Sequence, residues 1–180
     1  MIIQHRLPGC DTIAAHEVRA AVFQNEQGIS AKDDYDGLDA TAEQFLALIS
    51  GKPVGTARYR LLGDGVAKVE RVAVLSEQRG NKVGHAIMEA IEYTAWRQHL
   101  GVLVLDAQQE VEHFYLRMGY QRDGDVFEEV GIPHVKMSLD VRHPSEAELH
   151  YGPFSKPYDY VDVYPGQTTS QTPRSSGIQF

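Results

Sequence analysis

The sequence contains a single cysteine, Cys10, among its 180 residues. One cysteine excludes an intramolecular disulfide and a cysteine-rich zinc site. Long apolar runs are also missing: no stretch approaches the roughly 20 residues of a membrane-spanning helix. The apolar run near the N-terminus is too short for a signal peptide. The sequence therefore predicts a protein without membrane contact, which we expect in the cytoplasm.

Positive charge is scarce as well. The chain has 17 Lys and Arg against 25 Asp and Glu, so its formal net charge is −8. Nucleic-acid binding needs a concentrated basic face, and this balance argues against a nucleic acid as partner. The eight histidines are scattered without an HxxxH spacing, so the sequence predicts no metal site. Its 42% hydrophobic and 23% charged residues are typical of a globular protein.

The composition changes near residue 143. Residues 143–180 hold five of the eight prolines and four of the nine tyrosines but few aliphatic residues. We therefore expect one folded domain over residues 1–142 and a C-terminal tail over 143–180 that is extended or partly disordered. Within the tail, the aromatic residues and prolines of Tyr151–Tyr164 would also suit an extended segment lying on this chain or on a partner subunit.

The first 142 residues alternate strand and helix signals. Helical spacing over residues 82–99 puts apolar side chains on one side, with Gly101 as the stop signal. Strands at Val66–Leu75 and Val102–Leu105 make this a β-α-β crossover, which requires parallel strands, whereas hairpins elsewhere favour antiparallel pairing. The sequence predicts an α/β (α+β) fold with a mixed, mostly antiparallel sheet. Further strands are expected at Ile2–Leu7, Phe45–Ile49, Val54–Leu62, Tyr120–Glu128 and Val135–Val141, further helices at about Asp11–Asn25 and Glu110–Met118, and a loop at 27–41.

A turn rich in glycine and cations lies between the strand Val66–Leu75 and the long helix. It reads Arg79-Gly80-Asn81-Lys82-Val83-Gly84. Helix N-termini expose unpaired N–H groups at a positive dipole end, and glycine lets phosphate oxygens approach the backbone. The spacing is neither a Walker loop nor a dinucleotide fingerprint. The turn suits a pyrophosphate, or it is an ordinary strand–helix turn whose cations face water.

A second segment, about thirty residues further on, contains Ala107-Gln108, Phe114-Tyr115 and Met118-Gly119-Tyr120. With both segments, the chain resembles the GCN5-related N-acetyltransferase (GNAT) family. The turn matches the family's R-x-x-G-x-G/A motif, except that Lys82 stands where the middle glycine is usual. This form is similar to the ElaA-like and YjcF-like branch. The resemblance covers about residues 2–142 and leaves the tail outside.

The resemblance implies an acyl-CoA N-acyltransferase fold, with a sheet of six or seven strands and a splayed central parallel pair. Acetyl-CoA would be the cofactor, its pantetheine arm lying between Val66–Leu75 and Val102–Leu105. The backbone of Val72, Ala73 and Val74 would bind that arm as a neighbouring strand would. The remaining cofactor-binding residues implied by the motifs are Arg79, Gly80, Asn81, Lys82, Val83, Gly84, Gln108 and Phe114, although Phe114 also suits the core.

The implied reaction is direct transfer of an acetyl group to a primary amine, with three candidate catalytic residues. Tyr115 would protonate the leaving thiolate, or it is a core aromatic with a bonded hydroxyl. Glu70 would accept the amine's proton because it shares pleat parity with Val72 and Val74, or it is paired to a cation. His134 is the second candidate base, because imidazole titrates near neutral pH.

The acceptor would be bound by the first helix and the loop after it. Glu26, Gln27, Asp36 and His134 are the expected substrate-binding residues, since carboxylates attract a cationic amine; the alternative is a solvated polar loop. The amine is a small molecule or an exposed lysine, and a homodimer is left open. The competing interpretation of the whole chain is a non-catalytic acyl-CoA-binding regulatory or interaction module.

Overall fold

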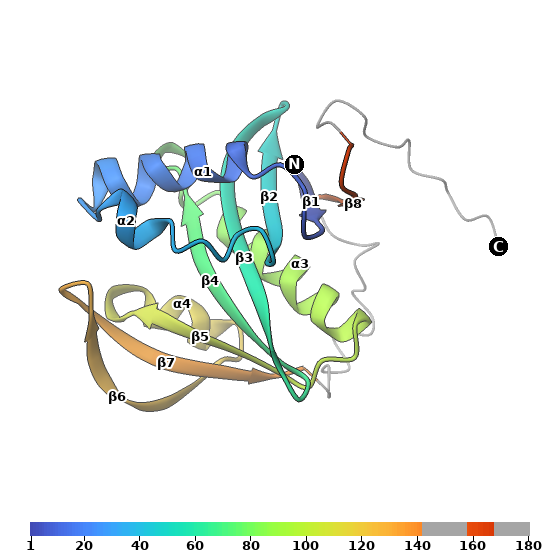
Figure 1. Ribbon diagram of the computed structural model, residues 1–180. Helices are drawn as coiled ribbons and strands as arrows, with labels where there is room; N and C mark the ends of the chain where they lie inside the picture. Colours follow the sequence, from blue (N-terminus) through green and yellow to red (C-terminus); the bar gives the residue numbers. More distant parts are fainter. Residues whose placement is uncertain (142–157, 168–180) are drawn as a thin grey trace.

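The computed structural model describes residues 1–141 and 158–167, which form one mixed sheet with helices on both faces (Figure 1). The strand order is β6-β7-β5-β4-β3-β2-β1-β8. The pairs β4–β5 and β1–β8 are parallel and the others antiparallel, which confirms the predicted fold class. In chain order the strands are β1 (Ile2–Arg6), β2 (Glu43–Ile49), β3 (Lys52–Gly63), β4 (Val66–Val74), β5 (Val102–Gln108), β6 (Gln121–Glu129), β7 (Ile132–Asp140) and β8 (Asp159–Val163).

Different helices cover the two faces of the sheet. Those on one face are α3 (Val83–Arg97) and α4 (Glu112–Arg117); those on the other are α1 (Ile13–Arg19), the π-helix η1 (Ala20–Glu26) and α2 (Ala31–Asp34). Short 3-10 turns precede α3 and α4: η2 (Ser76–Gln78) and η3 (Gln109–Val111). The predicted first helix is thus part α and part π, and the predicted loop 27–41 contains α2. No described helix is long and apolar enough to cross a membrane.

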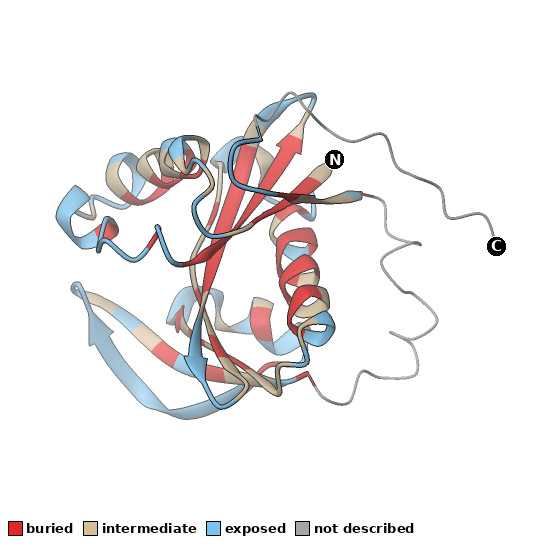
Figure 2. Ribbon diagram, turned by 45° about the vertical axis from the view of Figure 1, so that its right-hand side comes forward, coloured by how far each residue is buried: buried red, intermediate tan, exposed pale blue. Residues whose placement is uncertain are grey.

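Helix α3 packs its apolar side against the centre of the sheet, as its spacing predicts. Val83, Ile87 and Ile91 are each at most 1% exposed. Figure 2 shows buried residues in red along this helix. Gly55 on β3 permits this close approach, because a Cβ there would lie only 2.9 Å from Ile87 and 3.0 Å from Val83. The helix ends at Arg97, and His99, with φ of +58°, makes the left-handed turn for which the sequence favours Gly101.

Strands β4 and β5 separate along their length. They pair in parallel from Val66 with Val102 to Val69 with Leu105, and within the described residues the pairing stops there although both strands continue. Beyond this point β4 has an extra residue relative to β3, and Arg71 has a φ of +55°. This β-bulge bends β4 away from β5. The splayed central pair implied by the family resemblance is therefore present.

An eighth strand comes from the tail. Residues 159–163 form β8 and pair in parallel with β1, so the sheet has one strand more than the upper expectation. Asp162 fixes this strand by accepting from His5 at 2.7 Å and from both terminal nitrogens of Arg97 at 2.9 Å. The sequence indicates that Tyr151–Tyr164 suits an extended segment, but a run of only five residues does not reveal the strand with which it pairs. Of the predicted tail, residues 143–157 and 168–180 lie outside the described residues, as does residue 142.

Candidate functional site

A cavity of about 530 Å³ lies where β4 and β5 have separated. It is lined by residues of both strands, of η1, of the turn after β4, of α4 and of β7. Ten of the residues singled out in the sequence lie in this one lining: Glu26, Gln27, Glu70, Val72, Ala73, Val74, Arg79, Gln108, Tyr115 and His134.

The backbone of β4 faces this gap at alternate residues. The N–H of Leu75 donates to the carbonyl of Val54 on β3 at 3.0 Å. Because successive residues of a strand direct their backbone groups to opposite sides, Val74 and Val72 direct theirs away from β3, toward β5. Within the described residues β5 does not pair with them. The N–H and C=O groups of Val72 and Val74 are thus placed to pair with an extended amide-bearing chain.

The turn before α3 contains two residues in the left-handed conformation. Gly80 has a φ of +79° and Lys82, which precedes the helix, a φ of +60°. Lys82 thus adopts the left-handed conformation that glycine takes more easily, which accounts for the glycine usual at this motif position. The first N–H groups of α3, from Val83 and Gly84, have no partner within the helix. A Cβ at Gly84 would lie 3.7 Å from the ring of Phe114, which is partly buried against the main core.

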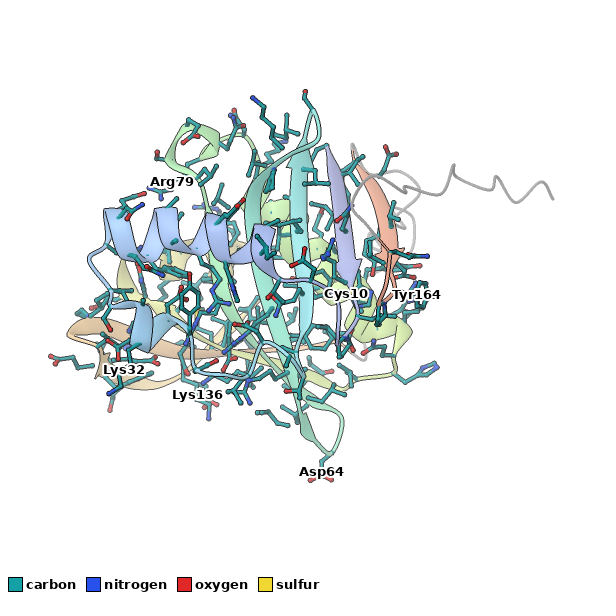
Figure 3. All side chains as sticks on the ribbon, turned by 45° about the horizontal axis from the view of Figure 1, so that its top comes forward. Cys10, Lys32, Asp64, Arg79, Lys136 and Tyr164 are labelled. Carbon is teal, nitrogen blue, oxygen red and sulfur yellow. The ribbon has the colours of Figure 1, made fainter. Side chains whose placement is uncertain are left out.

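Arg79 is already occupied in this structure. Its two terminal nitrogens donate to the two carboxylate oxygens of Glu26 at 2.5 and 2.7 Å, and its Nε donates to the carbonyl of Val74 at 3.1 Å. The hydrogen bond to Glu26 raises the pKa of Arg79 and lowers that of Glu26. Figure 3 shows Arg79 beside the end of the first helix, and both partners of the ion pair are more than 40% exposed.

Tyr115, on α4, lines the cavity although its residue is only 7% exposed. Its ring packs edge-on against Phe114 and Tyr120. Burial raises the pKa of Tyr115, so the phenol keeps its proton at neutral pH. Among residues 1–141 and 158–167 its hydroxyl has no hydrogen-bond partner. The alternative of a bonded core tyrosine is therefore not what the structure shows.

Glu70 lines the same cavity, but, contrary to the prediction from the sequence, its side chain does not share a face of β4 with Val72 and Val74. The bulge at Arg71 breaks the alternation, so Val72 and Val74 pack in the α3-side core while Ala73 packs under η1. Glu70 instead accepts from Arg60 at 2.7 and 2.8 Å and from Arg58 at 3.1 Å. Burial opposes its ionisation, but these bonds and charges outweigh that effect and lower the pKa of Glu70. The predicted shared parity is wrong, and the carboxylate has cationic partners.

His134, on β7, is half-buried at the wall of the cavity. Its Nδ1 lies 2.8 Å from the carbonyl oxygen of Ile132. Since a carbonyl oxygen only accepts, Nδ1 carries a proton and donates. In the neutral imidazole this leaves Nε2 with a free lone pair. The ring is thus held in the tautomer that a proton acceptor needs.

The residues expected to bind the acceptor separate into two groups. Glu26 and Gln27 line the cavity, and Gln27 accepts from the side chain of Gln108 at 3.2 Å. Asp36 is outside the lining and is bound by Arg58 and Arg71, which makes it part of the charged network beneath α1. The lining also contains Asp33 and Asp34 of α2, which belong to the acidic loop region expected near the acceptor. The sequence analysis did not single out three further acidic lining residues, which lie in β5, η3 and β6 without a distinctive motif: Asp106, Glu110 and Glu129.

The described residues contain no group of three His, Cys, Asp or Glu side chains arranged to hold a metal ion. A splayed parallel pair in a mixed sheet, with a cation-bearing turn at the start of α3 and a tyrosine on α4, defines a protein of the acyl-CoA N-acyltransferase fold.

Comparison with known proteins agrees with this assignment of the fold. The family model described as an acetyltransferase (GNAT) domain matches residues 14–141. The uncharacterized N-acetyltransferase YjcF of Bacillus subtilis is 36% identical over 127 residues, covering 70% of this chain and 90% of YjcF. ElaA of Escherichia coli is 32% identical over 129 residues, covering 69% of this chain and 84% of ElaA. The chain belongs to the GNAT acetyltransferase family and is an acyl-CoA-dependent N-acetyltransferase.

Solved structures show the same fold. The crystal structure of Escherichia coli ElaA has a TM-score of 0.64 at 31% identity, covering 71% of this chain and 88% of that chain. An aminoglycoside 6′-N-acetyltransferase complexed with coenzyme A has a TM-score of 0.64 at 12% identity, covering 81% and 99%. At 12% identity, the similarity to the aminoglycoside 6′-N-acetyltransferase concerns the fold alone.

Proposed function

We propose that this protein transfers the acetyl group of acetyl-CoA directly to a primary amine, on a small molecule or an exposed lysine. One observation carries the proposal: the open gap between β4 and β5 is bordered by the outward-facing backbone of Val72 and Val74 and by the unbonded hydroxyl of Tyr115. The residues present fit the cofactor's chemistry. Backbone groups face its amide-bearing arm, and a helix N-terminus with Arg79 and Lys82 suits its pyrophosphate.

Acetyl-CoA supplies the acetyl thioester that the amine attacks. The N–H of Val74 faces the gap and is our choice of donor to the negative charge that develops on the carbonyl oxygen. Tyr115, which keeps its proton at neutral pH, donates it to the departing thiolate. The amine nitrogen becomes bonded to the acetyl carbon as the carbon–sulfur bond breaks.

The amine must lose a proton, and we assign its acceptance to His134 in preference to Glu70. The Nε2 of His134 has a free lone pair because Nδ1 donates to Ile132. Glu70 has its pKa lowered by Arg60 and Arg58, so it holds a proton poorly. We give Glu70 the role of an anionic group that attracts the ammonium, together with the acidic residues Glu110 and Glu129 of the lining.

A thiol-release assay with acetyl-CoA tests the proposed function. The panel of acceptors contains spermidine, glucosamine, free lysine, an aminoglycoside and a lysine-containing peptide. We expect thiol release that depends on one class of amine, with formation of the acetylated amine confirmed by mass spectrometry. Binding of CoA without turnover on any amine would instead favour a non-catalytic acyl-CoA-binding module.

A further inference from the structure

Two consecutive side chains at the end of η1 connect the two strands that border the cavity. Glu26 pairs with Arg79, which follows β4. Gln27 accepts from Gln108, the last residue of β5. We call Glu26 and Gln27 the strap, because together they bridge the open end of the gap. The strap lies at the end of a π-helix, a distortion that is frequent at functional sites.

All three guanidinium nitrogens of Arg79 are hydrogen-bonded in this structure, two of them to the strap and one to Val74. The terminal nitrogens donate to Glu26, and the remaining one donates to the carbonyl of Val74. That carbonyl faces the gap and is one of the groups that our proposed function assigns to the amide-bearing arm of the cofactor. A phosphate therefore has to replace Glu26 to reach the guanidinium, and an amide has to replace Arg79 to reach Val74.

A cationic amine in the cavity would give Glu26 a new partner once a phosphate displaces it from Arg79. Glu26 lines the cavity together with Glu110 and Glu129, which form no ion pair within the described residues. A cationic amine in this cavity would be attracted by all three carboxylates. In the present structure Arg79 neutralises the charge of Glu26. The three carboxylates together attract an amine only after Arg79 has bound another anion.

We infer that Glu26 exchanges between Arg79 and the ammonium group of the acceptor, so that binding of a phosphate-bearing acyl-CoA strengthens binding of the amine. This inference rests on the proposed function and makes Glu26 a positioning residue for the acceptor. The coupling is reciprocal: the cofactor raises the affinity for the amine by the same factor as the amine raises the affinity for the cofactor. Because the Arg79–Glu26 pair is exposed, we expect a factor of about two to five.

Isothermal titration of the full-length protein with CoA tests the competition. Glu26→Gln leaves Arg79 free, and we expect CoA to bind it about two- to fivefold more tightly than the wild type, with the gain shrinking at high salt. Pantetheine, which lacks phosphate, should bind both proteins equally. The matched control is Glu77→Gln, which removes an exposed carboxylate near Arg79 that is not hydrogen-bonded to it, and it should change CoA affinity little.

Two results would overturn the competition. One is unchanged or weaker CoA binding by Glu26→Gln in a variant that melts at the wild-type temperature. The other is an equal gain for pantetheine, which would mean that Glu26 blocks the arm and does not compete with phosphate. Glu26→Asp, which keeps the charge on a shorter side chain, should fall between wild type and Glu26→Gln.

Steady-state kinetics test the second part of the inference, the pairing of Glu26 with the amine. The acceptor is the amine of the panel that gives the fastest thiol release. We expect Glu26→Gln to raise KM for that amine about two- to fivefold with kcat little changed. An unchanged KM for the amine would contradict the exchange. Failure of every amine to react would refute the proposed function, whereas the CoA titrations would still decide the competition.

Discussion

Glu70 lies between two groups of charged side chains, one buried beneath α1 and one at the cavity, and the two groups differ in how many of their polar atoms are hydrogen-bonded. Beneath α1 lies the Arg58 cluster, in which the two central cations Arg19 and Arg58 are at most 1% exposed. Each of their guanidinium nitrogens donates to an oxygen. The other members of the cluster are the carboxylates that receive these bonds: Asp34, Asp36, Asp39 and Glu70.

At the cavity the bonding is incomplete. The hydroxyl of Tyr115 and the carboxylates of Glu110 and Glu129 have no such partners within the described residues, and the Arg79–Glu26 pair is open to solvent. Buried charges must be fully partnered because an unpaired one is costly, whereas exposed groups can exchange partners at little cost. The comparison teaches that the Arg58 cluster fixes residues 27–41 beneath α1, whereas the cavity residues keep groups with which a ligand can bond.

The strongest test of this contrast is Arg58→Met. The substitution leaves Asp36, Asp39 and Glu70 each short of a buried partner, and breaking a buried ion pair in this way typically costs about 3–5 kcal/mol. We expect a loss of that size in the free energy of unfolding, measured by urea denaturation. Arg60→Met is the matched control: Arg60 also binds Glu70 but is partly exposed, and its loss should cost about 1 kcal/mol or less. Equal losses would contradict the distinction.

Tyr115→Phe should have the opposite profile, with activity lost and stability kept. Removing a proton donor to the leaving group typically lowers a rate by at least about a hundredfold. We expect that loss in kcat, with CoA affinity and melting temperature unchanged, because the hydroxyl has no partner in the folded protein. Tyr120→Phe is the control, since its buried hydroxyl also lacks a partner but lies outside the cavity lining. A similar rate loss in both variants would remove Tyr115 from the mechanism.

The Arg58 cluster should also show in the response to acid. The hydrogen bond from Arg58 lowers the pKa of Asp36 to about 2 from an ordinary value near 3.8. A carboxyl whose folded pKa is depressed stabilises the protein above its unfolded pKa, and this stabilisation disappears as the pH falls through the folded pKa. Because Asp36 is largely exposed, we expect a contribution of about 1 kcal/mol that is lost between pH 4 and 2. Urea denaturation across this range should show a shallower pH dependence in Arg58→Met.

The sequence predicts the core of the fold because its signals there are local. Apolar spacing places α3, and the β-α-β pattern requires the parallel pairing of β4 and β5. The π-helical turn, the bulge at Arg71 and strand β8 are missed because each is decided by tertiary contacts. Arg71 has its positive φ while its side chain is held by the backbone carbonyls of Asp33 and Asp34. No short pattern in the chain encodes such a contact.

The same distinction applies to the site. Motif residues such as Tyr115 and Val74 lie in the cavity because the family fold places them there. Glu70 and Asp36 are harder to predict, since their surroundings depend on Arg58 and Arg60 of β3 and, for Asp36, on Arg71 of β4. A carboxylate in a sequence does not reveal whether its nearest neighbours will be cations or empty space.

The smallest expected effects concern Lys82. Its left-handed backbone costs about 1 kcal/mol in a non-glycine residue, and the greater freedom of glycine in the unfolded chain costs a similar amount. Lys82→Gly should therefore leave the melting temperature nearly unchanged while weakening CoA binding about two- to threefold through the lost charge. Lys82→Asn separates the two effects, because asparagine tolerates this conformation but is uncharged. If both variants bind CoA like the wild type, Lys82 shapes the turn without contacting phosphate, and Arg79 is left as the cation for which Glu26 and the cofactor compete.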